Sequence, residues 1–579
     1  MIKIFKNFNK KQLFLIVVSV IFIFIQVFLE LKMPDYMSNI TKLVQTSGSK
    51  MNDILANGFY MLLCAFGSFM VSVFTGYIIA YITSSLSLSL REKLFNKILS
   101  FSTSTTKEFE VSSLITRTTN DVTQIEMTLG MGLQLLIKSP ITAVWAITKI
   151  LNRSVLWSSY TAISVFVLMF VVGILVVLVV PRFKIIQKLT DKLNSVTRES
   201  LTGIRVVRAF NASNYQEDKF DKVNNDLFKQ EIFIQSAFSV MQPIIFLVMY
   251  LLTLSIYFSG ATIISNSMMS DKLNVFSNMI VFSSYSIQVI MSFLMLAMIF
   301  TIIPRAIVSS KRINEVLDKV ENNVDGTFIG NTKLKGEVEF RNVSFKYPDA
   351  EEYVLKDISF KASKGEVVAF IGSTGSGKST LINLVPRFYD VFSGEILVDG
   401  MNVKEYKKST LNEKLGYVSQ KAVLLNGSVK FNIDFGKNID MKTIKESIKI
   451  AQASEFVEAM DKKYDSIIAP SGTNISGGQK QRLSIARAIA KNPEIYIFDD
   501  SFSALDYKTD SILRKELRKN MKDSTVLIVA QRIGTIMNAD KIIVLDQGKI
   551  VGIGKHKELL KNCNVYKEIA LSQLSEEEL

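Results

Sequence analysis

The chain has 579 residues, too many for one ordinary domain, so two or more domains are expected. Hydrophobic residues make up 48% of it and crowd into the first half, which is unlike a soluble protein. The formal net charge is +15, and because nothing in the sequence resembles a nucleic-acid module, we expect no nucleic-acid partner and attribute the charge to the cytoplasmic loops of a membrane protein. The two cysteines, Cys64 and Cys563, are expected to be free thiols, since a bridge would have to join membrane to cytosol.

Six apolar runs are candidate membrane spans, because about 20 mostly apolar residues cross a bilayer as a helix. No small-residue cleavage site follows the first run, so we predict an uncleaved span rather than a secretory signal. The connections between runs alternate between short ones and long ones rich in lysine and arginine. The positive-inside rule places the long connections and both termini in the cytoplasm. The predicted spans are residues 13–33, 56–83, 130–150, 156–180, 237–263 and 277–303.

The two long connections, residues 84–129 and 181–236, are predicted to be largely helical. They are rich in helix-forming residues, and no proline lies between Pro181 and Pro243. A structureless connection of that length would be unusual in a compact protein. We therefore expect the membrane helices to continue well into the cytosol.

The composition changes after Pro304 and divides the chain. Residues 1–315 are predicted to form a helical transmembrane domain, residues 316–335 a polar linker, and residues 336–579 a second domain. From Gly336 onward, short β-rich runs alternate with helix-like stretches, which is typical of an α/β domain.

A phosphate-binding loop is predicted at the first strongly marked strand of this domain. Val367–Ile371 is a buried-strand pattern, Gly372–Ser379 follows the pattern GxxxxGKS, and a helix begins directly after it. The glycines let backbone N–H groups surround the phosphates, and the helix N-terminus adds positive potential. Lys378 is expected to reach the β- and γ-phosphates, and Ser379 to ligate Mg²⁺. The predicted ATP contacts here are Gly372, Ser373, Thr374, Gly375, Ser376, Gly377, Lys378, Ser379 and Thr380.

Three further segments follow in a fixed order. Ser476-Gly477-Gly478-Gln479 opens a helix-like stretch, and Ile495–Phe498 leads into Asp499 and Asp500. Ser503-Ala504-Leu505-Asp506 comes next. With the phosphate-binding loop, these segments resemble the nucleotide-binding domain of an ATP-binding cassette (ABC) transporter. With the six spans, nearly the whole chain resembles an ABC exporter half: six long helices extending into the cytosol, plus an α/β P-loop domain with a helical signature subdomain.

The resemblance implies roles for several residues. Tyr347 lies where the family stacks an aromatic ring on adenine, and Gln420 ends a segment similar to the Q-loop, which senses Mg²⁺ and contacts the membrane domain. Asp499 would hold Mg²⁺, and Asp506 belongs to the D-loop at the dimer interface. The signature residues would close over the ATP held by a partner subunit; they are Ser476, Gly477, Gly478 and Gln479. Residues 108–114 would form the first coupling helix, and residues 199–210 would precede the second.

Two residues depart from the family pattern. Asp500 stands where a glutamate polarises the attacking water, and Gln531 stands where the family usually carries its switch histidine. The catalytic candidates are therefore Asp500, Gln531 and Gln420, in a site expected to be degenerate. The signature motif itself is complete, although Pro470-Ser471-Gly472 replaces the usual sequence before it. The single histidine, His556, is expected to mark a structural turn.

The paired departures suggest a heterodimer with a different half-transporter. We expect hydrolysis mainly at the composite site that this chain's signature forms with the partner, and ATP and Mg²⁺ as cofactors. Amphipathic compounds or drugs would leave across a bacterial plasma membrane, with membrane lipid in contact. A lipid or peptide exporter, and a regulatory ATP-binding subunit or ATP-gated channel, remain alternatives.

Five polar residues within the spans are candidates for substrate contact: Gln26, Glu30, Lys138, Gln242 and Gln288. Alternatively, Lys138 reaches the inner membrane interface and Glu30 lies in the outer one.

Overall fold

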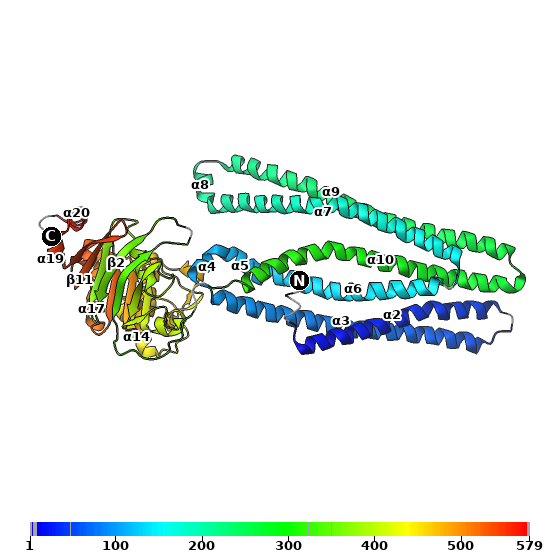
Figure 1. Ribbon diagram of the computed structural model, residues 1–579, viewed down its shortest axis with the longest axis horizontal. Coiled ribbons are helices and arrows are strands. Elements are labelled where there is room, and N and C mark those ends of the chain that lie inside the picture. Colours follow the sequence, from blue (N-terminus) through cyan, green and yellow to red (C-terminus); the bar gives the residue numbers. More distant parts are fainter. Residues whose placement is uncertain are drawn as a thin grey trace. The chain divides into compact units, whose positions relative to one another are not determined.

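The computed structural model describes residues 3, 8–46, 48–151, 153–321, 325–348 and 350–575. The described chain divides into two compact units (Figure 1): Met1–Leu99 with Ser112–Lys319, and Ser100–Val111 with Val320–Leu579. Residues 322–324 of the predicted linker lie outside the described residues.

The first unit consists of long helices. Among the described residues, six helical segments are long and apolar enough to cross a membrane, and each predicted span falls on one of them. Helix α7 has 48 residues and α9 has 54, far more than a bilayer requires, so the prediction of helices that continue beyond the spans is confirmed. The helices are α2 (Lys10–Gln45), α3 (Met51–Leu99), α5 (Val111–Thr118), α6 (Asn120–Leu151), α7 (Val155–Thr202), α8 (Ile204–Ala209), α9 (Ser213–Asn266) and α10 (Met269–Leu317).

These helices pack mainly in pairs: α2 with α3, α6 with α10, and α7 with α9. Figure 1 shows the α7–α9 hairpin diverging from the other helices toward α8. A buried cluster that includes Ile23, Val27, Phe282 and Tyr285 joins α2 to α10. Polar contacts add a second connection, because Asp35 on α2 accepts hydrogen bonds from Lys149 at 2.9 Å, Arg153 at 2.9 Å and Tyr285 at 2.8 Å.

The first predicted coupling segment differs in detail from the structure. Residues 108–114 do not form one helix, because Glu110 has a left-handed φ of 54° and separates α4 (Thr103–Phe109) from α5. The Ser100–Val111 segment belongs to the second unit, where the Lys107 ammonium lies 5.8 Å from the centre of the Tyr389 ring. Residues 199–210, predicted to precede the second coupling helix, contain the short helix α8.

The second unit is built around a six-stranded sheet of order β12-β11-β3-β10-β9-β6 and a four-stranded sheet of order β2-β1-β4-β5; β7 and β8 pair separately. The strands are β1 (Val338–Phe345), β2 (Leu355–Ala362), β3 (Val367–Gly372), β4 (Ser393–Val398), β5 (Met401–Asn402), β6 (Leu415–Val418), β7 (Gly427–Ser428), β8 (Ile467–Ile468), β9 (Ile495–Asp499), β10 (Thr525–Val529), β11 (Lys541–Asp546) and β12 (Lys549–Gly554).

The helices of this unit cover the sheets and form the signature subdomain. Helix α16 packs against α13 and α14, which follow β6 in the chain. The helices are α11 (Lys378–Leu384), α12 (Lys408–Lys414), α13 (Val429–Asp434), α14 (Met441–Ile450), α15 (Ser454–Glu458), α16 (Gly477–Ala490), α17 (Tyr507–Asn520), α18 (Ile533–Ile536), α19 (His556–Asn562) and α20 (Asn564–Leu571), with 3₁₀ turns η1 (Lys463–Asp465) and η2 (Pro470–Gly472).

The sheet register places the predicted site. Strands β3, β10 and β9 are parallel neighbours, with Val529 opposite Phe370 on one side and Asp499 on the other. Every residue of β9 and β10 is buried, as expected for strands covered on both faces. The three carboxyl ends therefore lie side by side, and ligands bind at this edge in open α/β sheets.

Candidate nucleotide-binding site

The loop between β3 and α11 has the geometry that the sequence predicts. Gly375 and Gly377 have φ of 85° and 95°, and a Cβ on Gly377 would lie 2.7 Å from Leu355 Cδ2. Lys378 donates to the carbonyl oxygens of Gly372 at 2.9 Å and Ser373 at 2.7 Å. Burial lowers the pKa of Lys378. The lysine is thus held against the loop, whose glycine conformations leave backbone N–H groups free of side-chain crowding.

The residues predicted to hold Mg²⁺ converge at the end of β9. The hydroxyl of Ser379 donates to Asp499 Oδ1 at 2.6 Å, although the two residues are 120 positions apart. A hydroxyl and a carboxylate are the hard oxygen ligands that Mg²⁺ takes beside substrate phosphates. Asp499 is 5% exposed, so it is fixed at the edge of the sheet. The residues present therefore fit a Mg²⁺–ATP site, where the metal would neutralise phosphate charge.

Asp500 lies between two glutamine side chains. The amide nitrogens of Gln531 and Gln420 both donate to Asp500 Oδ2, at 2.8 Å and 3.3 Å. Asp500 has a left-handed φ of 45°, and its N–H donates to the carbonyl of Val529. The three residues predicted as catalytic are therefore brought together, and the carboxylate is held by both amides.

Burial governs the electrostatics of the two adjacent aspartates. It raises the pKa of both Asp499 and Asp500, because their charged forms lose contact with water, and the Asp500 charge raises the pKa of Asp499 further. Two neighbouring buried carboxylates favour a cation between them and the phosphate-binding loop, which is where the sequence predicts Mg²⁺.

Tyr347 lies beside the phosphate-binding loop. Its hydroxyl is 3.0 Å from Thr380 Oγ1, the residue that follows Ser379. Its ring meets Tyr389 edge-on at 5.3 Å and Phe345 edge-on at 5.1 Å. This aromatic group fixes the ring next to the loop, in a position consistent with the predicted base contact.

The signature residues form the N-terminus of α16. Ser476 and Gln479 make a capping box: Gln479 N–H donates to Ser476 Oγ at 3.3 Å, and Ser476 N–H donates to Gln479 Oε1 at 2.9 Å. A Cβ on Gly478 would lie 3.2 Å from the carbonyl oxygen of Ala504, so the signature contacts the D-loop closely, whereas a Cβ on Gly477 would meet open space. Asp506 caps the next helix by accepting from Thr509 N–H at 2.9 Å.

Sequence reasoning missed one connection in this region. The Gln481 amide, on α16, donates to the carbonyl of Ser419, which precedes Gln420, at 3.2 Å. This hydrogen bond joins the signature helix to the predicted Q-loop, and its only sequence signal is a glutamine just after the signature.

His556 begins α19 and its Nδ1 is 2.7 Å from the Tyr566 hydroxyl, in agreement with the expected structural role.

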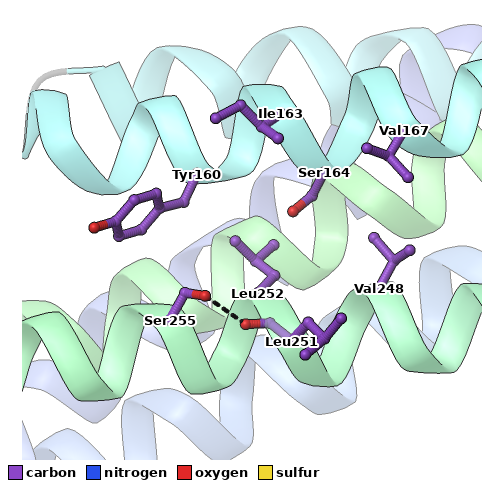
Figure 2. Close-up of a pocket in the computed structure, with 8 residues that line it drawn as sticks. All are labelled: Tyr160, Ile163, Ser164, Val167, Val248, Leu251, Leu252 and Ser255. Carbon is purple, nitrogen blue, oxygen red and sulfur yellow. Dashed lines mark hydrogen bonds between the residues drawn. The ribbon is translucent and has the colours of Figure 1, made fainter.

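A shallow groove of 230 Å³ between α7 and α9 is a separate feature (Figure 2). Of its polar groups, the Ser255 hydroxyl already donates to the Leu251 carbonyl at 2.8 Å. The groove therefore offers mainly apolar contact. Its lining residues are Tyr160, Ile163, Ser164, Val167, Val248, Leu251, Leu252 and Ser255.

Comparisons with known proteins agree with this architecture. Residues 14–293 match the family described as ABC transporter transmembrane region, and residues 355–503 match the one described as ABC transporter. An uncharacterized ABC transporter ATP-binding protein of Mycobacterium tuberculosis (strain ATCC 25618 / H37Rv) is 37% identical over 519 residues, which cover 88% of this chain and 87% of the relative. The chain belongs to the ABC transporter family.

Two further relatives and one solved structure also match most of the chain. The uncharacterized ABC transporter ATP-binding protein YfiB of Bacillus subtilis (strain 168) is 35% identical, with 88% of each chain covered. An ATP-dependent lipid A-core flippase of Haemophilus influenzae (strain 86-028NP) is 31% identical, covering 86% of this chain and 85% of the flippase. A solved structure of a bacterial Atm1-family ABC exporter with ATP bound aligns with a TM-score of 0.81 at 22% identity, over 98% of this chain and 100% of that one.

Family membership establishes the general activity. The ABC transporter is an ATP-driven exporter and a multi-pass membrane protein, and its ATP-binding domain implies an ATPase coupled to transport. The predicted fold class, a helical transmembrane domain with an α/β nucleotide-binding domain, is confirmed. ABC ATPase domains bind ATP and generally use Mg²⁺. The roles of single residues in the site stay predictions.

Proposed function

We propose that this chain is the degenerate-site half of a heterodimeric bacterial ABC exporter. Its own site would bind ATP through Lys378, Ser379 and Asp499 and hydrolyse it slowly. The signature at the start of α16 would complete a second site with a different half-transporter, and hydrolysis there would drive transport.

The observation that carries this proposal is the double hydrogen bond to Asp500 Oδ2 from Gln420 and Gln531. A general base must contact the attacking water, and two amides already occupy Asp500 Oδ2, so this oxygen is less available to orient that water, even though burial raises the pKa of the carboxyl group. The aspartate is also one methylene shorter than glutamate, and phosphoryl transfer depends on positioning. A neutral glutamine in place of the histidine adds no charge to stabilise the transition state.

Exposed apolar surface on the first unit supports a partner subunit. Phe210, next to α8, is 80% exposed, and Val206 on α8 is 60% exposed. Apolar side chains gathered outside the spans mark protein contact surfaces. A second half-transporter is the partner that a family of paired cassettes would supply.

We propose amphipathic compounds as cargo, moved outward across the plasma membrane, with both termini in the cytoplasm. Relatives named lipid A-core flippases, at about 30% identity, favour a lipid among these compounds. The predicted drug cargo has no comparable support from the named relatives.

The test is to purify the tagged chain from its native membrane in mild detergent and to identify and count the subunits that accompany it. We expect a one-to-one complex with a different ABC half-transporter that carries glutamate and histidine at the two altered positions. A homodimer would overturn the heterodimer proposal. Sustained ion conductance in a bilayer recording, without ATP-dependent export, would favour a channel or regulatory subunit instead.

A further inference from the structure

A charged pair lies inside the membrane helices. Glu30 on α2 and Lys138 on α6 form an ion pair, with Lys138 Nζ 2.9 Å from Glu30 Oε1. Lys138 is eleven residues before Lys149 on the same helix, or about 16 Å along its axis. Because the two side chains are in contact, Lys138 cannot lie at the inner membrane interface while Glu30 lies at the outer one. The two charges share one depth within the helical bundle.

Neighbouring polar groups converge on the same carboxylate. Gln26 Nε2 and the Ser68 hydroxyl also donate to Glu30 Oε1, at 2.9 Å and 3.3 Å, so α2, α3 and α6 all contribute. Within the described part of the chain, no hydrogen bond is found to Glu30 Oε2. The amide orientation of Gln26 is fixed by its bond to Glu30, and its Oε1 is buried with no donor among the residues that the structure describes. The cluster thus has acceptor oxygens left over.

Gln288 on α10 lies at a similar level. Ser38 bonds to Ser277, and Tyr285 bonds to Leu31 and Asp35, so α2 and α10 run antiparallel with position 288 facing the level of Glu30. The Gln288 Oε1 is also buried without a donor among the described residues. The pair itself remains reachable, because the side chains of Glu30 and Lys138 are 25% and 20% exposed.

Aromatic rings lie on the same two helices as the charges. The Trp145 ring, on the same helix as Lys138, contacts Phe24 at 5.0 Å and Phe28 at 5.6 Å between ring centres. Phe24 and Phe28 are exposed on α2. A charged pair on the same helices as exposed aromatic rings suits a molecule with a polar head and an apolar body.

From this geometry we propose that Glu30, Lys138 and Gln26 bind a zwitterionic amphipath that carries an ammonium with N–H groups close to an anionic group, as in a phosphoethanolamine headgroup. This inference rests on the proposed exporter function and names its cargo class. The Glu30–Lys138 pair itself has no net charge, so a ligand with net charge that binds to it would leave one charge uncompensated in a low-dielectric region. The nearby Lys32 ammonium lies instead over the Phe28 ring, 5.6 Å from its centre. A zwitterion supplies an anion for Lys138, which has three donors, and a cation for Glu30.

Hydrogen bonding adds a second requirement. Glu30 Oε2 and Gln26 Oε1 are acceptors, so the cationic end of the ligand needs N–H groups. A primary ammonium donates to both once α2 and its neighbours admit it, whereas a quaternary choline cannot donate at all. The site should therefore distinguish phosphatidylethanolamine from phosphatidylcholine, which have the same charge.

The test measures equilibrium binding of acyl-chain-labelled phosphatidylethanolamine, phosphatidylcholine and phosphatidylglycerol to the purified complex in detergent. We expect phosphatidylethanolamine to bind at least tenfold more tightly than the other two. The double variant Glu30→Gln/Lys138→Gln removes both charges and leaves neither one unpaired. Its affinities for the three lipids should lie within about twofold of one another, which corresponds to a difference in binding free energy of roughly 0.4 kcal/mol. Gln26→Leu keeps the ion pair and should still reduce the preference over phosphatidylcholine.

Asp35→Asn is the matched control, because it breaks two different ion pairs made by the same helix, those with Lys149 and Arg153, and should keep the lipid preference. Loss of the preference in Asp35→Asn equal to that in the double variant would overturn the proposal, as would equal affinities in the wild type. If a long-chain α-amino acid competes with phosphatidylethanolamine, the site recognises any ammonium close to an anionic group. If it does not compete, the site requires the phosphate headgroup. ATPase activity is measured on the same preparations: its absence in the wild type contradicts the proposed function, whereas its presence without lipid preference overturns only this inference.

Discussion

The amide of Gln531 donates to Asp500 Oδ2 at 2.8 Å, so the two residues that depart from the family pattern contact each other directly. They are 31 positions apart and come from the ends of neighbouring strands β9 and β10. A shorter carboxylate and a neutral amide thus form one hydrogen-bonded unit. Restoring one residue alone would leave the other half of this unit in place.

We therefore expect Asp500→Glu combined with Gln531→His to raise ATP hydrolysis at this site by at least about tenfold, a lower bound set below the roughly 10²- to 10⁴-fold that a positioned general base contributes. Asp500→Glu alone should give a smaller increase, because Gln420 and Gln531 still donate to the carboxylate. The measurement is the ATPase rate of the complex when the partner's catalytic glutamate has been replaced by glutamine. An unchanged rate in the double variant would show that positions 500 and 531 do not limit hydrolysis.

The raised pKa values of Asp499 and Asp500 predict a pH dependence of stability without nucleotide. The folded chain holds more protons than the unfolded chain between the usual aspartate pKa and the raised one, so the free energy of unfolding falls as pH rises through that window. Asp500→Asn removes the contribution of Asp500 to this effect while keeping an acceptor oxygen. Its melting temperature should exceed that of the wild type at neutral pH, with the difference shrinking toward about pH 4.

Asp440→Asn is the control for this titration. Asp440 caps α14, and the hydrogen bonds from Thr443 lower its pKa, so its charge stabilises the folded chain above the usual aspartate pKa. The variant should be less stable than the wild type at neutral pH, and the deficit should vanish in acid. A pH-independent difference for Asp500→Asn would show that its burial does not govern the proton balance.

Local patterns were sufficient to predict much of this fold. The apolar runs located six helices because spanning length and hydrophobicity are properties of a contiguous segment. The glycine spacing at 372–377 is also a property of one contiguous segment, and it predicted a strand, a loop and a helix. Strand β3 and helix α11 lie where expected. The break at Glu110 was missed because a left-handed glutamate carries no local signal.

Contacts between distant segments could not be predicted from the sequence. The Glu30–Lys138 pair joins helices whose relative rotation is set by packing, so each residue alone had an ordinary explanation. The shared acceptor at Asp500 Oδ2 depends on the order β3-β10-β9-β6, which brings together loops separated by 80 and 31 residues. Motif order predicted which residues gather, and the parallel register determined which atoms meet.

Tyr347 provides a test of ATP binding that is independent of hydrolysis. Tyr347→Phe should keep the affinity for ATP, because it removes only the hydroxyl contact with Thr380 and retains the ring. Tyr347→Ala should weaken ATP binding by about 5- to 150-fold, since stacking on a base contributes roughly 1–3 kcal/mol. The measurement is nucleotide titration of the complex with the partner's phosphate-binding lysine removed. Equal affinities in the Phe and Ala variants would place the base elsewhere.

The composite-site assignment predicts that Ser476 acts on the partner's ATP. Ser476→Ala removes the cap of α16 at a typical cost of about 1 kcal/mol, and it removes a hydroxyl from the signature. Ser428→Ala is matched to it, because Ser428 caps α13 through Phe431 N–H at 3.0 Å and lies outside the signature. We expect similar stability losses, but a fall in the complex's ATPase rate only for Ser476→Ala. Equal ATPase losses in the two variants would reduce Ser476 to a helix cap and would remove the signature from the working site.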